Sequence, residues 1–303
     1  MDHILGIDLG GTNTKLGIVS RDGRLLEQDS IPTSPLEGPE SWAQRIGESL
    51  SKWKTPFTEV GVGSPGPLET SSGTILFTPN LKSFEGRSLK ALLEKQLQKR
   101  SFFENDANCA ALAEFHFGPL RGTRDLVVIT LGTGVGSGII SSGSLVRGHR
   151  GFASEIGHTR ITANSGPHCH CGRQGCLEAY LGGRRLVERF RELTGQNRSP
   201  KEIFQADQDK DPIATQLIDE WAWALSIAID EMFLLFEPEH LVLSGGLAQA
   251  WPSVESRVQY QLNSLPSKEA IKSMKIGMSR LGGYFGVLGA AALVLDLSSE
   301  KNG

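Results

Sequence analysis

Two stretches of the sequence share one pattern, in which short runs of strand-forming residues are broken by glycines. The first, residues 4–28, reads ILGIDLGGTNTKLGIVSRDGRLLEQ, and the second, residues 126–148, reads LVVITLGTGVGSGIISSGSLVRG. Three glycines of each stretch align when two single-residue gaps are allowed: Gly10, Gly17 and Gly23 with Gly132, Gly138 and Gly143. Such runs are typical of strands joined by tight hairpins. The repeat therefore predicts two lobes of related topology, each presenting a Gly-rich turn to a shared cleft.

Length and charge narrow the class of protein. A chain of 303 residues is near the size at which one hydrophobic core stops growing, so two lobes are expected. The net charge is −3, and no basic surplus favours nucleic acid. The N-terminus lacks the pattern of a secretory signal, and no apolar run approaches the ~18 residues of a membrane span. We expect a soluble, cytoplasmic protein without nucleic-acid or membrane partners.

The segment DLGGTNTK, residues 8–15, predicts a phosphate-binding turn. Paired glycines let backbone N–H groups approach a phosphate closely, and Thr12 or Thr14 can add hydrogen bonds. Asp8 is suited to holding a magnesium ion or its waters. An ordinary hairpin would also explain the two glycines alone, but the acid and the hydroxyls favour phosphate.

LGTGVGSG, residues 131–138, predicts a second cradle, with Thr133 and Ser137 as hydroxyl donors. It is not a Walker loop, because the sequence has no Gly-Lys-Ser or Gly-Lys-Thr, and it fails the dinucleotide fingerprint. A literal G-x-G-x-x-G occurs at residues 61–66, but Pro65 and Pro67 make that segment a stiff turn. We therefore reject a Rossmann interpretation.

ENDANCAALAE, residues 104–114, predicts a helix that begins just after a strand. The helix dipole keeps an acid at this end ionised, which suits a carboxylate that orients a hydroxyl and accepts its proton. Simple N-capping by Asn105 or Asp106 is the alternative, and the spacing does not choose between them. Cys109 is expected to be a small buried residue.

Three of the four cysteines lie within eight residues: Cys169, Cys171 and Cys176. Together with one histidine they would form the complete ligand set of a tetrahedral structural zinc. His158 lies eleven residues upstream, and His168 and His170 compete for the fourth position, a choice that spacing leaves open. Unpaired cysteines that merely pack are the alternative, which the turn-forming glycines between them disfavour. Zinc would also fix Glu155 near its histidine.

Periodicity predicts the remaining elements. Helices are expected at 40–53, 88–100, 105–117, 181–193, 214–236 and about 286–297, and strands at 58–62, 101–103 and 240–243. Residues 194–211 are expected to form a polar connection, and the last helix is long enough to pack on the first lobe.

Together these segments resemble the sugar kinases of the ROK family (repressor, open reading frame, kinase), in the actin-like ATPase superfamily that includes hexokinase. The resemblance runs from about residue 4 to 293. Besides the motifs above it rests on GSPGP at 63–67, PNL at 79–81, GHRGFASEIGH at 148–158 and LVLSGGL at 241–247.

The resemblance implies an α/β, two-lobed actin-like ATPase (ribonuclease H-like) fold with a ligand cleft between the lobes. A small lobe would comprise residues 1–116 plus 287–303, and a large lobe 117–286 would carry the zinc knuckle. The family's repressors have a winged-helix domain ahead of the phosphate motif, and the position of Asp8 so near the start disfavours that class.

Matched by position, the resemblance makes Asp106 the catalytic base toward the sugar hydroxyl. Six residues match the family's sugar-binding positions: Asn80, Asn105, Asp106, Glu155, His158 and Glu178. The resemblance also makes His158 the fourth zinc ligand, beside Cys169, Cys171 and Cys176. Ten residues match its ATP and magnesium positions: Asp8, Gly10, Gly11, Thr12, Lys15, Gly132, Thr133, Gly134, Gly245 and Gly246.

The implied activity is ATP-dependent phosphorylation of a hexose at its 6-hydroxyl, with glucose as the leading substrate and with ATP, Mg²⁺ and structural Zn²⁺ bound. Two departures bear on the sugar: residues 82–84 read Lys-Ser-Phe where the family commonly has Pro-Gly-Trp, and Ser154 replaces a common glycine. The alternatives are an N-acetylmannosamine or N-acetylglucosamine kinase and a fructokinase. A non-catalytic sugar sensor and a zinc-knuckle interaction module are alternatives from other classes. A homodimer, common in the family, is expected.

Overall fold

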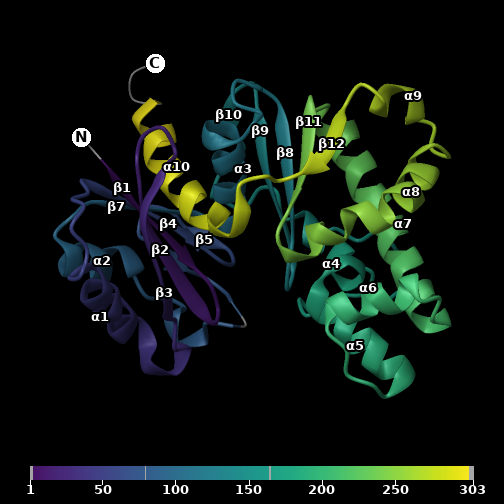
Figure 1. Cartoon of the computed structure of the whole chain (residues 1–303), viewed down its shortest axis with the longest axis horizontal. Coiled ribbons are helices and arrows are strands. Elements are labelled where there is room, and N and C mark those ends of the chain that lie inside the picture. The colour runs from purple at the N-terminus through teal and green to yellow at the C-terminus, as the bar shows by residue number, and fades with distance from the viewer. Residues whose placement is uncertain (1–2, 79, 164, 300–303) are drawn as a thin grey trace. The chain divides into compact units, whose positions relative to one another are not determined.

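The computed structural model describes residues 3–78, 80–163 and 165–299, which form two compact units (Figure 1). The first unit contains the described residues of 1–123, 145–153 and 280–303, and the second contains 124–144 and 154–279. The chain thus passes from the second unit to the first at residue 145 and returns to the second unit at residue 154. The predicted lobe boundaries, 1–116 plus 287–303 and 117–286, stay a prediction.

A five-stranded sheet forms the centre of the first unit, in the order β3-β2-β1-β4-β7. Its strands are β1 (Ile4–Leu9), β2 (Asn13–Val19), β3 (Leu25–Pro32), β4 (Glu59–Ser64) and β7 (Ser101–Asn105). β1, β2 and β3 pair antiparallel, which confirms the predicted hairpins, and β4 and β7 run parallel to β1. A small separate sheet pairs β5 (Leu68–Glu69) with β6 (Thr74–Ile75).

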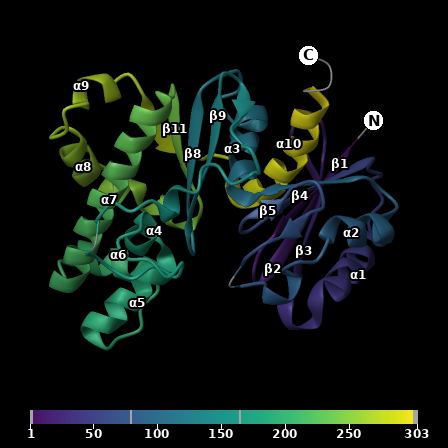
Figure 2. The same cartoon turned by 180° about the vertical axis from the view of Figure 1, so that it is seen from behind.

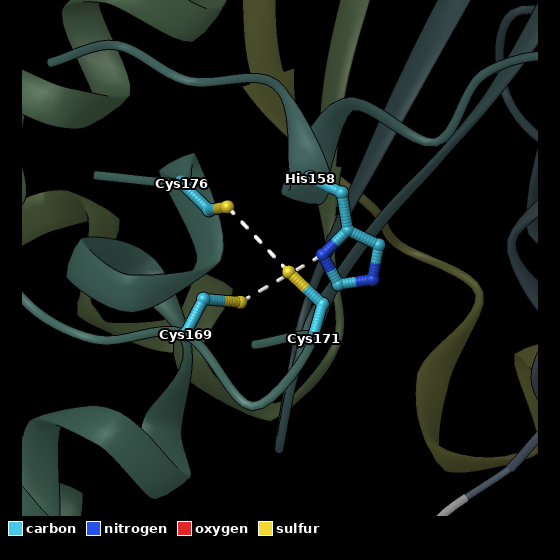
Figure 3. Close-up of side chains that lie close together, drawn as sticks. All are labelled: His158, Cys169, Cys171 and Cys176. Atoms are coloured by element: carbon cyan, nitrogen blue, oxygen red, sulfur yellow. Dashed lines mark hydrogen bonds between the residues drawn. The ribbon is translucent and has the colours of Figure 1, made fainter. Parts of the chain in front are cut away.

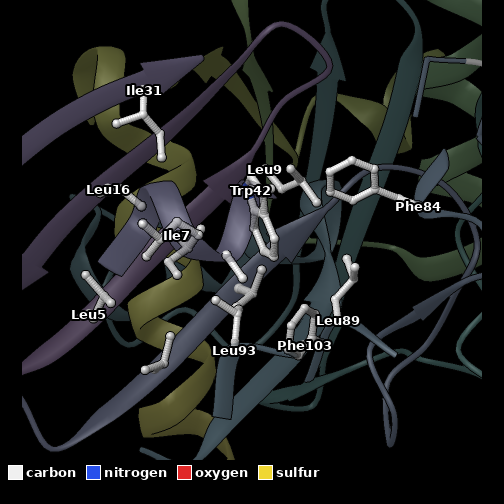
Figure 4. Packing of buried hydrophobic residues seen from close by; sticks show 14 of the residues in the cluster. Leu5, Ile7, Leu9, Leu16, Ile31, Trp42, Phe84, Leu89, Leu93 and Phe103 are labelled. Carbon is white, nitrogen blue, oxygen red and sulfur yellow. The ribbon is translucent and has the colours of Figure 1, made fainter. Parts of the chain in front are cut away.

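Helices cover both faces of this sheet. On one face Leu5, Ile7 and Leu9 of β1 pack in a cluster with Trp42 of α1 (Gly38–Leu50) and Leu93 of α2 (Leu89–Leu97) (Figure 4). Ile4 and Val19 belong to a second cluster with residues of α3 (Asp106–Phe117) and α10 (Phe285–Ser299). Alternation of side chains along the strands produces these two buried faces.

The last helix packs on the first unit, as predicted. α10 lies against α3, β1 and β4, and Figure 2 shows it along the sheet from behind. The two helices approach closely because their facing residues are small: a Cβ at Gly289 would lie 2.5 Å from the carbonyl carbon of Cys109. Cys109 is fully buried, as expected for a small apolar residue.

The second unit repeats the strand order of the first. Its sheet has the order β10-β9-β8-β11-β12. The strands are β8 (Leu126–Leu131), β9 (Val135–Ser141), β10 (Ser144–Leu145), β11 (His240–Ser244) and β12 (Lys275–Met278). β8 pairs antiparallel with β9 and parallel with β11, which in turn runs parallel to β12. The glycine repeat therefore reports a real duplication of the sheet topology.

Among its described residues, the second unit contains the helices α4 (Leu177–Leu181), α5 (Gly183–Thr194), α6 (Pro200–Gln208), α7 (Pro212–Phe236), α8 (Trp251–Leu262) and α9 (Lys268–Ile271). The described residues also form short 3₁₀ helices. In the first unit these are η1 (Pro35–Glu37), η2 (Lys82–Phe84) and η5 (Gly282–Tyr284), and in the second they are η3 (Ile156–His158) and η4 (Gly246–Ala250). Within the described part of the chain, no helix combines the length and the apolarity that crossing a bilayer requires.

One prediction about this unit was wrong. Residues 194–211 do not form a continuous polar connection, because they contain α6. Ser199 accepts from the Glu202 backbone N–H while the Glu202 side chain accepts from the Ser199 backbone, a capping box that starts the helix. Ile203 and Phe204 are buried, and Phe204 meets the ring of Trp221 on α7 edge to face.

Candidate active site

Four side chains of the second unit converge on one point. The ligand atoms of His158, Cys169, Cys171 and Cys176 all lie within 4.8 Å of one another (Figure 3). His158 ends η3 and Cys176 precedes α4, while the loop between them is folded by backbone bonds from Cys169 N to the Arg173 carbonyl (2.8 Å) and from Gly172 N to the Cys169 carbonyl (3.0 Å). The fold thus gathers four residues spread over nineteen positions of sequence.

The geometry of this cluster fits a tetrahedral metal site. Cys171 Sγ lies 3.7 Å from Cys176 Sγ, and Cys169 Sγ lies 3.8 Å from His158 Nδ1. A disulfide would need ~2.05 Å, and all three cysteines are free thiols. The edge of a zinc–thiolate tetrahedron with Zn–S ≈ 2.3 Å is about 3.8 Å. Three sulfurs and one imidazole are also the donor set that zinc prefers.

The structure distinguishes among the three candidate histidines. His168 Nε2 lies 3.0 Å from Gln174 Nε2, and His170 Nε2 lies 3.2 Å from Glu188 Oε1. Neither belongs to the cluster, whereas His158 does. Nδ1 of His158 faces the sulfurs and Nε2 lies on the far side of the ring (Figure 3), where it can serve a different partner.

Two carboxylates accompany this histidine. Glu178, in the first turn of α4, accepts from the Val135 backbone N–H through Oε2 (3.0 Å), and its Oε1 lies 3.7 Å from Cys169 Sγ. Glu155 directly precedes η3. Burial raises the pKa of Glu155, His158 acts to lower it, and the neighbouring Glu178 adds to the rise. The result is a polar group of two acids and an imidazole held beside the cysteine cluster.

Ser154, the residue that replaces a common family glycine, adopts a left-handed conformation with φ of 72°. Its carbonyl accepts from Ser137 Oγ (2.7 Å), and the two hydroxyl oxygens are 2.5 Å apart. Ser137 is only 3% exposed. Ser137 was expected to donate to phosphate, but its hydroxyl is buried and engaged with the residue that precedes Glu155.

The predicted base lies in the first unit, at the start of α3. Asn105 caps the helix, since its Oδ1 accepts from the backbone N–H groups of Ala107 (2.9 Å) and Asn108 (3.3 Å). Asp106 is the first helical residue and is exposed. Asn105 is therefore the cap, and Asp106 Oδ1 also accepts from the Ala107 backbone N–H (2.8 Å). The role of Asp106 as the base stays a prediction.

The first predicted phosphate turn joins β1 to β2. Gly10 N donates to the Asn13 carbonyl (3.1 Å), and Thr12 is exposed. Thr14 is fully buried and accepts from Trp42 Nε1 (2.9 Å), so of the two threonines only Thr12 faces solvent. Asn80, exposed, lies next to Gly11: a Cβ on that glycine would be 3.3 Å from the Asn80 Cβ. Pro79 of the PNL motif lies outside the described residues.

Two residues that flank this turn, Asp8 of β1 and Lys15 of β2, contact the segment around η5 and α10. Asp8 lies against the first turn of α10, where a Cβ at Gly286 would be 2.5 Å from its carboxyl carbon. Burial raises the pKa of Asp8, and the charge of Lys15 opposes that shift. A cation near this carboxylate would oppose it in the same way, so the residue fits a magnesium or magnesium-water contact. Lys15 donates to the Gly283 carbonyl (2.8 Å) and lies over the Tyr284 ring.

The second Gly-rich turn, Gly132–Gly134, joins β8 to β9. Its carbonyls are taken by the start of α5, because Gly183 N donates to Gly132 (2.9 Å) and Arg184 N to Thr133 (3.2 Å). A Cβ on Gly132 would meet open space. Gly245 and Gly246 follow β11, and a Cβ on Gly246 would likewise meet nothing within 4 Å.

Sequence reasoning missed two residues that support the Asp106 turn. The buried Glu104 forms an ion pair with the partly buried Arg147 (2.8 Å), and neither residue was predicted to have a role. A signal was present for Glu104, since it is an acid on a strand whose Ser101 and Phe103 are buried. The predicted sugar contacts are divided between the units, with Asn80, Asn105 and Asp106 in the first and Glu155, His158 and Glu178 in the second.

The mixed α/β architecture, with its duplicated sheet and two Gly-rich turns, is that of the actin-like ATPase fold predicted from the sequence. The sequence model of the ROK family matches residues 4–297. The chain belongs to the ROK family.

Three relatives illustrate this membership. A glucokinase of Thermotoga maritima is 32% identical over 97% of both chains. An N-acetylmannosamine kinase of Haemophilus influenzae is 31% identical over 98% of this chain and 97% of its own. The crystal structure of a ROK family glucokinase from Streptomyces griseus in complex with glucose and AMPPNP superposes with a TM-score of 0.82, at 30% identity, covering 96% of this chain and 98% of that one.

Proposed function

We propose that this protein is an ATP-dependent hexose kinase that phosphorylates the 6-hydroxyl of its sugar, with glucose as the leading substrate. Family membership and the glucokinase relatives support the reaction class. The structural observation that carries the proposal is the Cys₃His cluster, in which Nδ1 of His158 faces the sulfurs and Nε2 lies on the far side of the ring. Glu155 is near enough to feel the charges of His158 and Glu178. Such a group of acceptors and a donor matches the hydroxyls of a sugar.

The sugar contacts follow from this arrangement. With Nδ1 committed to a metal, the proton of a neutral His158 ring must reside on Nε2, which then donates to a sugar oxygen. Glu155 and Glu178 accept from sugar hydroxyls, and Asn80 and Asn105 supply amide groups that can both donate and accept. Zinc has a structural role in this proposal, because all four of its ligand positions are filled by protein.

Asp106 is the proposed base. The oxygen of the 6-hydroxyl forms a new bond to the γ-phosphorus, the bond from the γ-phosphorus to the β,γ-bridging oxygen breaks, and ADP leaves. The hydroxyl proton passes to the Asp106 carboxylate late in this transfer, because phosphoryl transfer depends more on positioning than on a strong base. Its place in the first turn of α3 keeps that carboxylate ionised.

The Gly10–Gly11, Gly132–Gly134 and Gly245–Gly246 turns are proposed to contact ATP, together with Thr12, Thr133 and Lys15. The N–H groups of Gly10 and Gly132 already donate to the Asn13 and Gly134 carbonyls (3.1 and 3.0 Å). The other backbone N–H groups of these turns are therefore the proposed donors to phosphate oxygens. Asp8 would hold a magnesium ion or its waters. Magnesium, when bound, neutralises charge on the β- and γ-phosphates.

The identity of the sugar is the finer part of the proposal. The N-acetylmannosamine kinase and the glucokinase relatives have nearly equal identity to this chain, so overall similarity does not select between them. Ser154, next to Glu155, is the residue in this chain that bears on the choice. We place glucose first because the glucokinases provide both a sequence relative and a solved complex.

ADP release measured by a coupled assay tests the function. Purified protein with ATP and Mg²⁺ is given glucose, mannose, fructose, N-acetylglucosamine or N-acetylmannosamine in turn, with sugar-free protein as the control. Sugar-dependent ADP release with glucose fastest is expected. Faster release with an acetamido sugar would identify that sugar, rather than glucose, as the preferred substrate. Sugar binding without any ADP release would support the non-catalytic sensor.

Two further elements belong to the same proposal. A cytoplasmic location agrees with three free thiols in one site, which an oxidising compartment would not preserve. A homodimer is the assembly we propose, and light scattering of the purified protein measures it.

A further inference from the structure

A buried carboxylate lies directly behind the turn that carries Asp106. Glu104, the penultimate residue of β7, is 1% exposed. Its Oε1 accepts from the Asn105 backbone N–H (2.9 Å) and from Asn108 Nδ2 (3.0 Å), and its Oε2 accepts from Arg147 Nε (2.8 Å). One carboxylate thus bonds the residue before Asp106 and a side chain two residues after it.

The guanidinium of Arg147 extends this contact to α10. Its Nη2 donates to Asp296 Oδ2 (2.8 Å), and Asp296 is 5% exposed. The second oxygen of Asp296 lies 3.7 Å from His116 Nε2 on α3. Burial acts to lower the pKa of Arg147, but Asp296 and Glu104 outweigh it and raise that pKa. The guanidinium therefore joins the end of β7 to α10 through two nearly inaccessible acids.

Arg147 comes from an unusual place in the chain. It lies in the stretch 145–153, which belongs to the first unit although the residues on either side of it, up to 144 and from 154, belong to the second. The Ala153 N–H donates to the Arg147 carbonyl (3.2 Å), which closes the stretch into a loop just before Ser154 and Glu155. The two ion pairs of Arg147 are the charged anchor of this loop on the first unit.

We propose that Arg147 is a positioning residue for phosphoryl transfer, which holds the Asn105–Asp106 turn in its reactive orientation by fixing the Glu104 carboxylate. The inference rests on the proposed function of Asp106 as the base. The Glu104 carboxylate can orient the Asn105 N–H only if the carboxylate itself has a fixed position. Arg147 fixes that position by donating to the other carboxylate oxygen, Oε2. A displacement of about 1 Å at a reacting group can cost roughly 100-fold in rate.

Four variants test the proposal: Arg147→Met, Glu104→Gln, the double variant of both, and Arg147→Lys. Arg147→Met leaves the buried acids Glu104 and Asp296 without the Arg147 cation, and Glu104→Gln turns an amide toward a partly buried guanidinium. We expect each to lower kcat about 10- to 100-fold, with the KM for ATP changed less than about threefold. The double variant removes both mismatched charges at this contact and is expected to have a kcat above that of at least one single variant. Arg147→Lys, which keeps the charge but loses the two-pronged geometry, is expected to be intermediate.

Arg257→Met is the matched control, because Arg257 pairs with the buried Asp207 (2.9 Å) in the second unit, whereas the Asp106 turn belongs to the first. It should lower the melting temperature while kcat per folded molecule is unchanged. A merely structural role for Arg147 would give the same result, with kcat of Arg147→Met and Glu104→Gln within about twofold of wild type, and would overturn the inference.

If Arg147→Met does not fold, Arg147→Lys and Glu104→Gln decide the question by the same criterion. The proposed function is judged separately. If wild-type protein shows no sugar-dependent ADP release, or if Asp106→Asn turns over normally, the proposed function fails. If Asp106→Asn is inactive and both Arg147 and Glu104 variants keep wild-type kcat, only this inference fails.

Discussion

The Glu178 carboxylate occupies the space that a side chain at Gly134 would need: a Cβ built on that glycine would overlap Glu178 Oε2. The same oxygen accepts from the N–H of the next residue, Val135 (3.0 Å). Gly134 was predicted to be part of an ATP phosphate turn. The structure shows a second reason for a glycine at this position, because any side chain would overlap Glu178. It lets an acid beside the cysteine cluster approach the β8–β9 turn.

Gly134→Ala is therefore expected to displace Glu178 and to break its bond to Val135. A hydrogen bond to a charged group contributes about 1.5 to 3 kcal/mol, so kcat/KM for glucose should fall about 10- to 100-fold. Gly277→Ala is the matched control, because a Cβ on this strand glycine meets nothing within 4 Å. Unchanged kcat/KM in Gly134→Ala would show that Glu178 does not act on the sugar.

Metal analysis tests the Cys₃His cluster. We expect about one zinc ion per chain in the purified protein, and loss of zinc in Cys176→Ser, because the four ligands form a closed tetrahedral set. Cys109→Ala is the control, since that cysteine lies in the first unit and should leave the zinc content intact.

Removal of the zinc should affect sugar binding as well as stability. Binding to a site formed only in the folded chain stabilises the fold, so a chelator should lower the melting temperature. It should weaken glucose binding in calorimetry at the same time, because His158 loses its fixed orientation. Chelated protein that is destabilised but binds glucose as before would separate the metal from the sugar site.

Thr14 is expected to contribute to the stability of the fold, and Thr12 to the binding of ATP. Thr14→Val leaves the buried Trp42 Nε1–H without its acceptor, which should lower the free energy of unfolding by about 1 to 3 kcal/mol, measured by urea denaturation. Thr12→Val, at an exposed position, should leave stability within about 0.5 kcal/mol and raise the KM for ATP. A stable Thr14→Val protein with a raised KM for ATP would reverse these assignments.

Ser154 has a left-handed backbone and a hydroxyl bonded to Ser137. Ser154→Ala loses the hydrogen bond and keeps the strained backbone, whereas Ser154→Gly loses the bond and relieves the strain, which costs about 1 to 2 kcal/mol for a non-glycine residue. The glycine variant should therefore be more stable than the alanine variant by about 1 kcal/mol. Equal melting curves for the two would mean that the backbone at this position is not strained.

The repeated hairpins could be predicted because glycine spacing and strand-forming runs are local features of the sequence. The α3 start was predictable for the same reason, since Asn105 caps the helix that follows it. α6 could have been predicted as well, because Ser199, Pro200 and Glu202 form a local capping signal for a helix start. The polar residues around this signal favoured the wrong prediction of a connection without a helix.

The rest of the candidate site depends on residues far apart in sequence. Arg147 reaches Glu104 across 43 residues, and Glu178 reaches Val135 across 43 as well. No periodicity or local propensity encodes such pairs, because the folded topology creates them. The choice of His158 over His168 and His170 is of the same kind, since it depends on how the loop between the ligands folds.

The kcat of Asp106→Asn, measured by glucose-dependent ADP release, tests the central claim most directly. Asp211→Asn is the matched control, because Asp211 also starts a helix, as the N-cap of α7, and asparagine caps equally well. The account predicts that Asp106→Asn folds normally and loses about 10²- to 10⁴-fold in kcat, while Asp211→Asn keeps its activity. An Asp106→Asn protein that phosphorylates glucose at the wild-type rate would contradict it.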